Sequence, residues 1–283
     1  MTIRTALLQG QKLLDDAKIA VPKLTAEVLL MHAISHERTV DRAWLHAHSN
    51  DELSEMWWIH YGRYLHERTL GKPTQYITGR QEFYGREFRV SPDVLIPRPE
   101  TEHLVEAVSA RVRPGDRIVD IGTGSGAIAV TLALETAANV FATDVSAAAM
   151  AIARENARRL GAVVRFALGD LCEALAPASF DLVVSNPPYV PSREQSNLQR
   201  EVRDFEPALA LYGGEDGLEI YRRLIPQAVR AVKPGGWLAI ELGFGEAAAV
   251  REMLEGWNAI EVVSDLAGLP RVIVAQAGTS IAR

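Results

Sequence analysis

The sequence predicts an α/β protein in which a doubly wound, mostly parallel sheet follows a small helical bundle. Residues 3–69 have helical patterns throughout, and residues 117–276 alternate short apolar runs with amphipathic helical patterns. A glycine-rich loop joins the first of these apolar runs to a helix. At 283 residues the chain is long for a single core, so two domains are expected.

The composition is that of a globular protein, and it excludes several classes. Apolar residues make up 48% of the chain, and the net charge of −6 argues against extended, non-specific binding of nucleic acid. Cys172 is the single cysteine, so neither an intrachain disulfide nor a thiolate metal cluster is expected. The N-terminus lacks the apolar segment of a signal peptide, and no uncharged apolar run approaches membrane-spanning length. We therefore expect a cytoplasmic protein without a metal site or a membrane contact.

Residues 1–71 are expected to form the helical bundle as a domain of their own. Apolar residues recur at helical spacing in residues 3–14, 28–34 and 53–64. Ser49, followed three residues later by Glu52, has the pattern of a capping box. This pattern predicts the start of the last helix of the bundle.

Residues 72–102 differ in character and are expected to link two domains. Aromatic and β-branched residues around a glycine predict a short β-hairpin in residues 82–90. Two prolines, Pro97 and Pro99, then favour an extended chain, and the acidic residues after them suit the first turn of a helix. That helix is expected to continue to Pro114. The linker could also close over a ligand.

Residues 103–283 are expected to form the second domain, with seven strands and intervening helices. Short runs rich in β-branched residues predict the strands, and residues 147–160 and 218–232 are examples of the helical patterns between them. The predicted strands are residues 117–121, 140–144, 163–168, 181–185, 237–242, 260–264 and 271–276.

The loop after the first predicted strand contains three alternating glycines, Gly122, Gly124 and Gly126. Glycines let the backbone approach a ligand closely, and the start of the following helix offers free N–H groups. The loop fits a dinucleotide fingerprint, with Asp144 at the spacing of a ribose-binding acid, so a nicotinamide-dependent oxidoreductase stays open. It fits neither a P-loop nor a nucleophile elbow. A tight packing turn explains one or two glycines better than three.

Asn186, Pro187, Pro188 and Tyr189 follow the predicted strand 181–185, at the edge where open α/β sheets bind their ligands. The side-chain oxygen of Asn186 and the carbonyl of Pro187 could both accept from one NH2 group, because a proline offers no competing N–H. Tyr189 supplies a ring face for a planar amide or base. Taken alone, these residues could equally form a turn that ends the strand.

Taken together, these polar segments resemble the S-adenosylmethionine-dependent methyltransferases that act on exocyclic or amide nitrogens. The resemblance implies a Rossmann-like class I methyltransferase domain with S-adenosyl-L-methionine as its cofactor. On this resemblance the glycine loop faces the methionine part of the cofactor, Asp144 binds the ribose hydroxyls, Asp170 with Leu171 lies near the adenine, and Asn186 borders both ligands. The implied loop residues are Gly122, Thr123, Gly124, Ser125 and Gly126.

Further segments narrow the resemblance to the PrmC/HemK family and extend it over nearly the whole chain. That family methylates the side-chain amide of the glutamine in the Gly-Gly-Gln motif of peptide-chain release factors, and its N-terminal helical domain helps to bind the release factor. The resemblance therefore implies a protein-glutamine methyltransferase with no direct nucleic-acid target, and we expect a monomer. The matching segments are residues 75–79, 83–85, 95–102, 186–189, 206–207 and 210–218.

The resemblance also implies roles at the substrate side of the site. Asn186 and Pro187 accept hydrogen bonds from the NH2 group of the substrate glutamine, and Tyr189 packs on the amide plane. Some relatives have an aromatic residue at the position of Leu171, so here the adenine is expected to rest on an aliphatic side chain and backbone. Four linker residues could line the methionine end of the pocket or the path of the release factor: Phe83, Arg98, Glu100 and Thr101.

Two further classes stay open beside this interpretation. A methyltransferase acting on a base amine in nucleic acid is one, because Asn186–Tyr189 would suit an extruded adenine equally well. The other is a non-catalytic binding module that keeps the fold.

Overall fold

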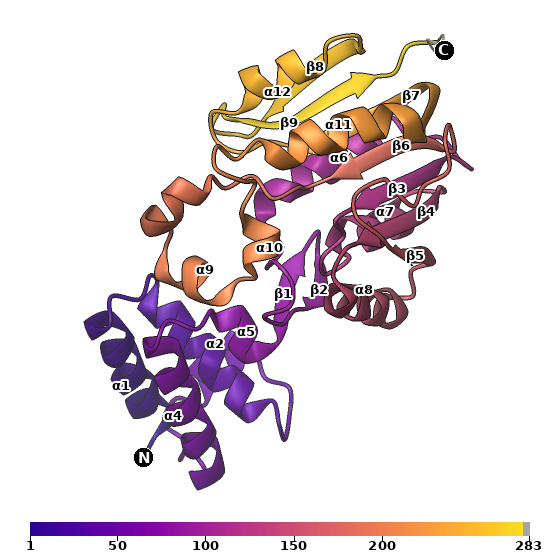
Figure 1. Ribbon diagram of the computed structural model, residues 1–283. Coiled ribbons are helices and arrows are strands. Elements are labelled where there is room, and N and C mark those ends of the chain that lie inside the picture. Colours follow the sequence, from indigo (N-terminus) through magenta and orange to yellow (C-terminus); the bar gives the residue numbers. More distant parts are fainter. Residues whose placement is uncertain (280–283) are drawn as a thin grey trace. The chain divides into compact units, whose positions relative to one another are not determined.

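The computed structural model describes residues 1–279, which form two compact units (Figure 1). The first unit comprises Met1–Gly79 together with Gln199–Phe205, and the second comprises Arg80–Leu198 and the chain from Glu206 onward. The first is helical, and the second contains a seven-stranded sheet and a two-stranded hairpin. The prediction of an α/β protein with an N-terminal helical part is confirmed.

The helical unit packs its helices around one apolar core. Leu14, Leu29 and Tyr61 are fully buried in this core and come from three different helices. Arg68 is also buried, and its guanidinium pairs with Glu201. The helices of this unit are α1 (Ile3–Asp16), α2 (Pro22–Ile34), α3 (Arg42–Ala47), α4 (Glu55–Thr69), α5 (Thr74–Thr78) and α9 (Arg200–Phe205).

The start of α4 differs from the sequence expectation. Ser54 caps this helix, and its hydroxyl accepts the Trp57 N–H at 3.2 Å. The segment before it pairs with the beginning of the chain, since the Arg4 N–H donates to the Ser49 carbonyl at 2.8 Å and Glu52 forms an isolated bridge with Thr2. The capping box predicted for Ser49 and Glu52 is wrong, because tertiary pairing holds both residues outside the helix.

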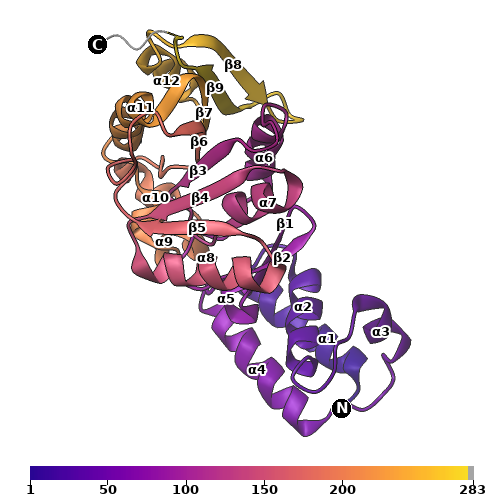
Figure 2. The same ribbon diagram turned by 90° about the vertical axis from the view of Figure 1, so that its right-hand side faces the viewer.

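The second unit is built on a sheet with the strand order β5-β4-β3-β6-β7-β9-β8 (Figure 2). In this sheet β9 runs antiparallel to β7 and β8, and the other neighbouring strands are parallel. All seven strands lie where the sequence predicts them, although β7 begins earlier. Their bounds are β3 (Arg117–Ile121), β4 (Asn139–Asp144), β5 (Val164–Leu168), β6 (Phe180–Ser185), β7 (Val232–Glu241), β8 (Asn258–Ser264) and β9 (Pro270–Gln276).

Helices cover both faces of this sheet. One buried cluster joins α6 (Glu102–Ser109), α7 (Ala127–Glu135) and α8 (Ala147–Leu160) to one face, and a second joins α11 (Glu219–Ala231) and α12 (Ala247–Met253) to the other. Successive side chains of a strand point to opposite faces, so Ile118 of β3 belongs to the first cluster and Val119 to the second. Burial on both faces explains why these strands are apolar runs.

The predicted β-hairpin is present as β1 (Arg80–Phe83) and β2 (Arg86–Arg89). Its two turn residues, Tyr84 and Gly85, have φ values of +53° and +68°, as a type I′ turn requires. Phe83 and Phe88 are buried and pack edge to face, with ring centroids 6.0 Å apart. The hairpin is thereby anchored on the first core cluster.

The chain then passes through the 3-10 helix η1 (Pro99–Thr101) into α6, which ends at Ser109 and not at the expected Pro114. The Arg113 N–H donates to the Asp116 carboxylate at 2.8 Å, so a turn replaces the last part of the expected helix. After β6 come the 3-10 helix η2 (Ser192–Asn197) and, beyond α9, the short helix α10 (Ala208–Leu211).

Candidate active site

The two segments singled out by the sequence meet where the strand order reverses. From β3 the chain proceeds outward to β4 and β5, and it then returns to β6 on the other side of β3. Ile121 and Ser185, the last residues of β3 and β6, are paired in this sheet. The glycine loop and Asn186 therefore leave the sheet side by side at its carboxyl edge, where such sheets bind ligands.

A cavity of about 300 Å³ opens at this edge. Its walls include most of the residues that the sequence assigned to the site, whereas Gly126, Pro187 and Tyr189 are not among the described residues that line it. Those three assignments stay predictions. The assigned residues in the wall are Gly122, Thr123, Gly124, Ser125, Asp144, Asp170, Leu171, Asn186 and Pro188.

The glycine loop is held in shape by Asp144. One oxygen of its carboxylate accepts the Gly124 N–H at 2.8 Å, and the other accepts the Ser146 N–H at 2.8 Å. Gly122 and Gly124 have φ values of +71° and +54°, in the left-handed region that favours glycine. A carboxylate has about four acceptor positions, so Asp144 can still bind two ligand hydroxyls.

Asp120 lies directly behind this loop and is fully buried. The Thr123 hydroxyl donates to its Oδ2 atom at 2.6 Å, and its Oδ1 atom has no hydrogen-bond partner among the described residues. Burial raises the pKa of this carboxyl to about 7, although the bond from Thr123 and a less well aligned contact with the Ala129 N–H lower it. Asp120 is therefore a candidate for protonation near neutral pH.

Asp170 and Leu171, which follow β5, also line the cavity. Asp170 pairs with the guanidinium of Arg223 on α11, which also lines the cavity. Leu171 has a φ of +49°, an unfavourable value for a residue with a side chain, and the Thr143 hydroxyl donates to its carbonyl at 3.3 Å. Leu171 thus contributes an aliphatic side chain to the cavity wall, and its contact with an adenine stays a prediction.

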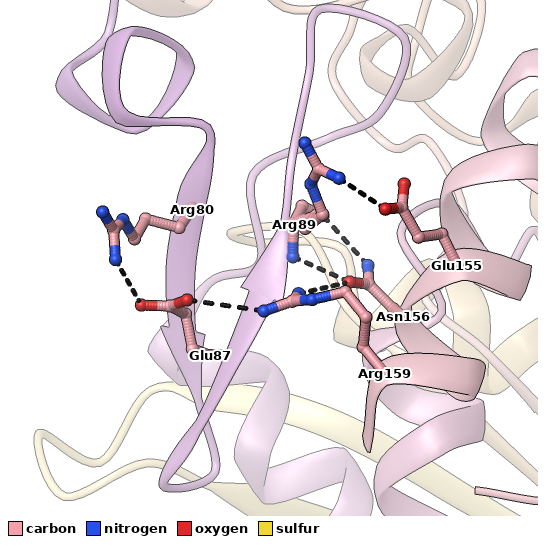
Figure 3. A network of polar contacts seen from close by, with 6 residues as sticks. All are labelled: Arg80, Glu87, Arg89, Glu155, Asn156 and Arg159. Atoms are coloured by element: carbon pink, nitrogen blue, oxygen red, sulfur yellow. Dashed lines mark hydrogen bonds and ion pairs between the residues drawn. The ribbon is translucent and has the colours of Figure 1, made fainter. Parts of the chain in front are cut away.

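Asn156 of α8 bonds to Arg89 of the hairpin (Figure 3) and also to Ser125 of the glycine loop. Its side-chain oxygen accepts the Arg89 N–H at 2.7 Å, and its NH2 group donates to the carbonyls of Arg89 and Ser125, both at 2.9 Å. Ion pairs surround it, including Arg89 with Glu155 and Arg159 with Glu87. No sequence pattern predicts a role for this fully buried residue, because its partners are backbone groups far away along the chain.

Asn186 presents its amide to the cavity in one orientation. Its NH2 group donates to the Thr101 hydroxyl oxygen at 3.1 Å, so its side-chain oxygen stays available to a ligand. The Tyr189 hydroxyl donates to Oε1 of Glu241 at 3.5 Å, and neither residue is among the described residues that line the cavity. Burial first, and then the charge of Glu241, raise the pKa of Tyr189, which keeps its proton. Pro187 is buried beneath the segment.

Several residues of the cavity wall were not assigned from the sequence. The linker contributes Asp93, Val94, Leu95 and Pro97, as well as Arg98 and Thr101, which the sequence had left without a definite role. The proline-rich composition of the linker was the available signal. Other contributors are on elements after β6. Pro207 and Ala210 belong to segments that carry the family resemblance, whereas no local motif marks Leu209, Ile220 and Arg223.

Among residues 1–279, no group of three His, Cys, Asp or Glu side chains could hold a metal ion. In the same residues, every helix is too short or too polar to cross a membrane.

Comparison with known domain families covers most of the chain. Residues 5–79 match the PrmC N-terminal domain, and residues 99–205 match the methyltransferase small domain. The second match includes the glycine loop and Asn186–Tyr189.

Similar proteins match over nearly their full lengths. A release factor glutamine methyltransferase from Koribacter versatilis is 46% identical over 285 residues, covering 99% of this chain and all of that protein. One from Neisseria gonorrhoeae is 44% identical, covering 89% of this chain and 92% of that protein. The crystal structure of a methyltransferase from Pyrococcus furiosus has the same fold, with a TM-score of 0.54 at 21% identity over 77% of this chain and 97% of that one.

Proposed function

The chain belongs to the release factor glutamine methyltransferases, and we propose that it transfers a methyl group from S-adenosyl-L-methionine to the glutamine side-chain amide in the Gly-Gly-Gln motif of peptide-chain release factors. The observation that carries this proposal is the orientation of Asn186. Its amide borders the cavity next to the glycine loop, and its bond to Thr101 leaves the oxygen available for the NH2 group of a substrate. A substrate amide held there lies beside the cofactor.

The cavity suits S-adenosylmethionine. Asp144 keeps acceptor positions for two ribose hydroxyls, the glycine loop offers close backbone approach, and Leu171 with Ile220 provides an apolar wall for a planar base. When bound, the cofactor supplies a methyl group on a positively charged sulfur. We propose these residues as its binding site, with Thr123, Ser125 and Asp170 completing the wall.

The task of the protein's own residues is to position the substrate nitrogen. An amide nitrogen is a poor nucleophile because its lone pair is conjugated with the carbonyl group. The Asn186 oxygen and the Pro187 carbonyl would hold the NH2 group, and good alignment of reacting groups can contribute about 7–11 kcal/mol. The surplus proton of the nitrogen can leave to solvent after transfer, so no strong general base is required.

The remaining expectations concern the helical unit and the setting of the reaction. We propose that residues 1–71 help to bind the release factor and that the linker of residues 72–102 joins them to the methyltransferase domain. We also propose that the enzyme acts as a monomer in the cytoplasm, where release factors work. The match of residues 5–79 to the PrmC N-terminal domain supports a shared task for this unit. The nicotinamide-dependent oxidoreductase that the glycine loop alone allowed is not the family to which the chain belongs.

The proposal is tested by methyl transfer to two forms of one release factor. Full-length protein is incubated with S-adenosylmethionine carrying a radiolabelled methyl group and with either the native Gly-Gly-Gln factor or its Gly-Gly-Ala variant. We expect label in the native factor alone, insensitive to ribonuclease. Equal labelling of both factors would overturn the proposal, and ribonuclease-sensitive label would point to a nucleic-acid amine as the acceptor.

A further inference from the structure

Glu241 lies behind the Asn186–Tyr189 segment, and the function proposed above gives it no task. It is the last residue of β7, and the pairing of Ser185 with Ile240 in the sheet brings Glu241 level with Asn186. Its side chain is 2% exposed. A carboxyl group buried to this extent loses its hydration and requires hydrogen-bond donors.

Two hydroxyl groups face this carboxyl, one from Tyr189 of the Asn186–Tyr189 segment and one from Thr101 in the cavity wall. The Tyr189 hydroxyl donates to Oε1 of Glu241 at 3.5 Å. The Thr101 hydroxyl faces the same carboxyl and lowers its pKa by hydrogen bonding, whereas Oε2 accepts no closely aligned bond. Thr101 is 4% exposed.

The direction of these bonds determines how the Asn186 amide is turned. A hydroxyl group has one proton and two acceptor lone pairs. If the Thr101 proton is held by the Glu241 carboxylate, the Thr101 oxygen can only accept, and the NH2 group of Asn186 is the donor 3.1 Å away. The Asn186 oxygen must then face the cavity. A neutral acid at Glu241 could donate to Thr101 instead, which would free the Thr101 proton for the Asn186 oxygen and allow the amide to turn over.

We propose that Glu241 and Thr101 are positioning residues for methyl transfer, in which the Glu241 carboxylate orients the Thr101 hydroxyl and Thr101 in turn fixes the Asn186 amide with its oxygen toward the substrate. The same carboxylate accepts a hydrogen bond from Tyr189, so one buried charge fixes the orientation of both Asn186 and Tyr189 at the two ends of this segment. The inference rests on the proposed function, because it concerns the group that binds the substrate NH2.

The charge of this carboxylate is expected to depend on pH. Burial raises the pKa of Glu241 to about 7, and the neighbouring Glu100 of η1 raises it further, while Thr101, Arg271 of β9 and Tyr189 lower it. The positioning network is complete only when Glu241 is ionised. The turnover number should therefore rise with pH through a midpoint near 7.

The first experiment compares Thr101→Val with Thr101→Ser in the full-length protein. Valine keeps the shape but removes the hydroxyl, whereas serine keeps the hydroxyl. We expect kcat to fall about 10- to 100-fold in Thr101→Val and by less than about threefold in Thr101→Ser, because small misplacements of a reacting group can reduce rates by about 100-fold. Affinity for S-adenosylmethionine, measured by calorimetry, should change by less than about threefold in both. Equal losses of kcat in the two variants, or no loss in either, would overturn the inference.

The second experiment measures kcat against pH for the wild type, Glu241→Gln and Glu246→Gln. Glu246 is the matched control, because burial also raises its pKa to about 7 and it lies outside the cavity wall among the described residues. The rise near pH 7 should disappear in Glu241→Gln and persist in Glu246→Gln. A rise that persists in Glu241→Gln contradicts the inference even if Thr101→Val fails to fold. A wild type that labels Gly-Gly-Ala as well as Gly-Gly-Gln contradicts the proposed function instead.

Discussion

The two walls of the active site are held in different ways. The cofactor wall follows β3 and is shaped by its own glycines, by Thr123 on Asp120 and by Asp144 at the end of the next strand. The substrate wall follows β6 and is held by side chains far away in the sequence, Thr101 at 85 residues from Asn186 and Glu241 at 52 residues from Tyr189. A local motif is therefore enough to recognise the cofactor wall, whereas the orientation of the substrate wall depends on tertiary structure.

The difference between the two walls also predicts which substitutions affect cofactor binding and which affect turnover. Changes in the cofactor wall should act mainly on binding of S-adenosylmethionine, and changes in the substrate wall should act mainly on turnover.

The largest effect is expected for Asn186→Ala. The substitution removes an acceptor for the substrate NH2 group and leaves the backbone of the segment in place. We expect kcat to fall at least about 100-fold, the size of effect that misplacement of a reacting group produces. Affinity for S-adenosylmethionine, followed by calorimetry, should change by less than about threefold. Unchanged methyl transfer would exclude the role assigned to Asn186. A parallel loss of cofactor affinity would show that the substrate wall also binds the cofactor, against the account.

A somewhat smaller effect is expected for Asp144→Ala, and it should fall on cofactor affinity rather than on kcat. The variant loses the charged acceptor for the ribose hydroxyls and the bond that holds Gly124. Hydrogen bonds to charged groups contribute about 1.5–3 kcal/mol, so Kd for S-adenosylmethionine should rise about 10- to 100-fold. At saturating cofactor kcat should fall less than in Asn186→Ala, measured with the same release factor. The reverse order of kcat values would show that the glycine loop also positions the substrate.

The smallest effects concern two buried carboxyls, one behind each wall. Burial raises the pKa of Asp120 and of Glu241 to about 7 in the folded protein. The folded state therefore binds protons that the unfolded chain releases near pH 4, so this contribution to stability is present below about pH 4 and is lost as the pH rises through about 7. Each group changes the free energy of unfolding by up to about 1.4 kcal/mol per pH unit within this window.

Urea unfolding between pH 4 and pH 8 measures this dependence. Asp120→Asn and Glu241→Gln should each make stability less dependent on pH, whereas Glu241→Gln alone should remove the pH dependence of kcat. If Asp120→Asn also removed the pH dependence of kcat, the charge of Asp120 behind the cofactor wall would influence the substrate wall.

Local patterns predicted the elements of the fold well. Residues 147–160 form α8 with the predicted bounds, and the hairpin turns at the predicted glycine, because amphipathic spacing and turn chemistry act within a few residues. The capping box at Ser49 and the extension of α6 to Pro114 are wrong because contacts outside the helices, from the chain start and from Asp116, decide those ends.

In the site, too, residues held by distant contacts could not be predicted from local patterns. Gly122, Asp144 and Asn186 could be named from strand ends and spacing, because parallel strands bring their carboxyl ends to one edge. Asn156 and Glu241 could not be named, since an asparagine within a helix and a glutamate at a strand end have no local signature. Their importance arises from burial and from partners that only the folded chain brings near.

Mass spectrometry of the methylated product tests the central claim most directly. Full-length protein is incubated with S-adenosylmethionine and a release factor, and the factor is digested and fragmented to locate the added methyl group. We predict a single added methyl, on the side-chain amide of the glutamine in the Gly-Gly-Gln motif, and none in a parallel reaction with Asn186→Ala. A methyl group on any other residue, or an unmodified glutamine after complete reaction, would contradict the account.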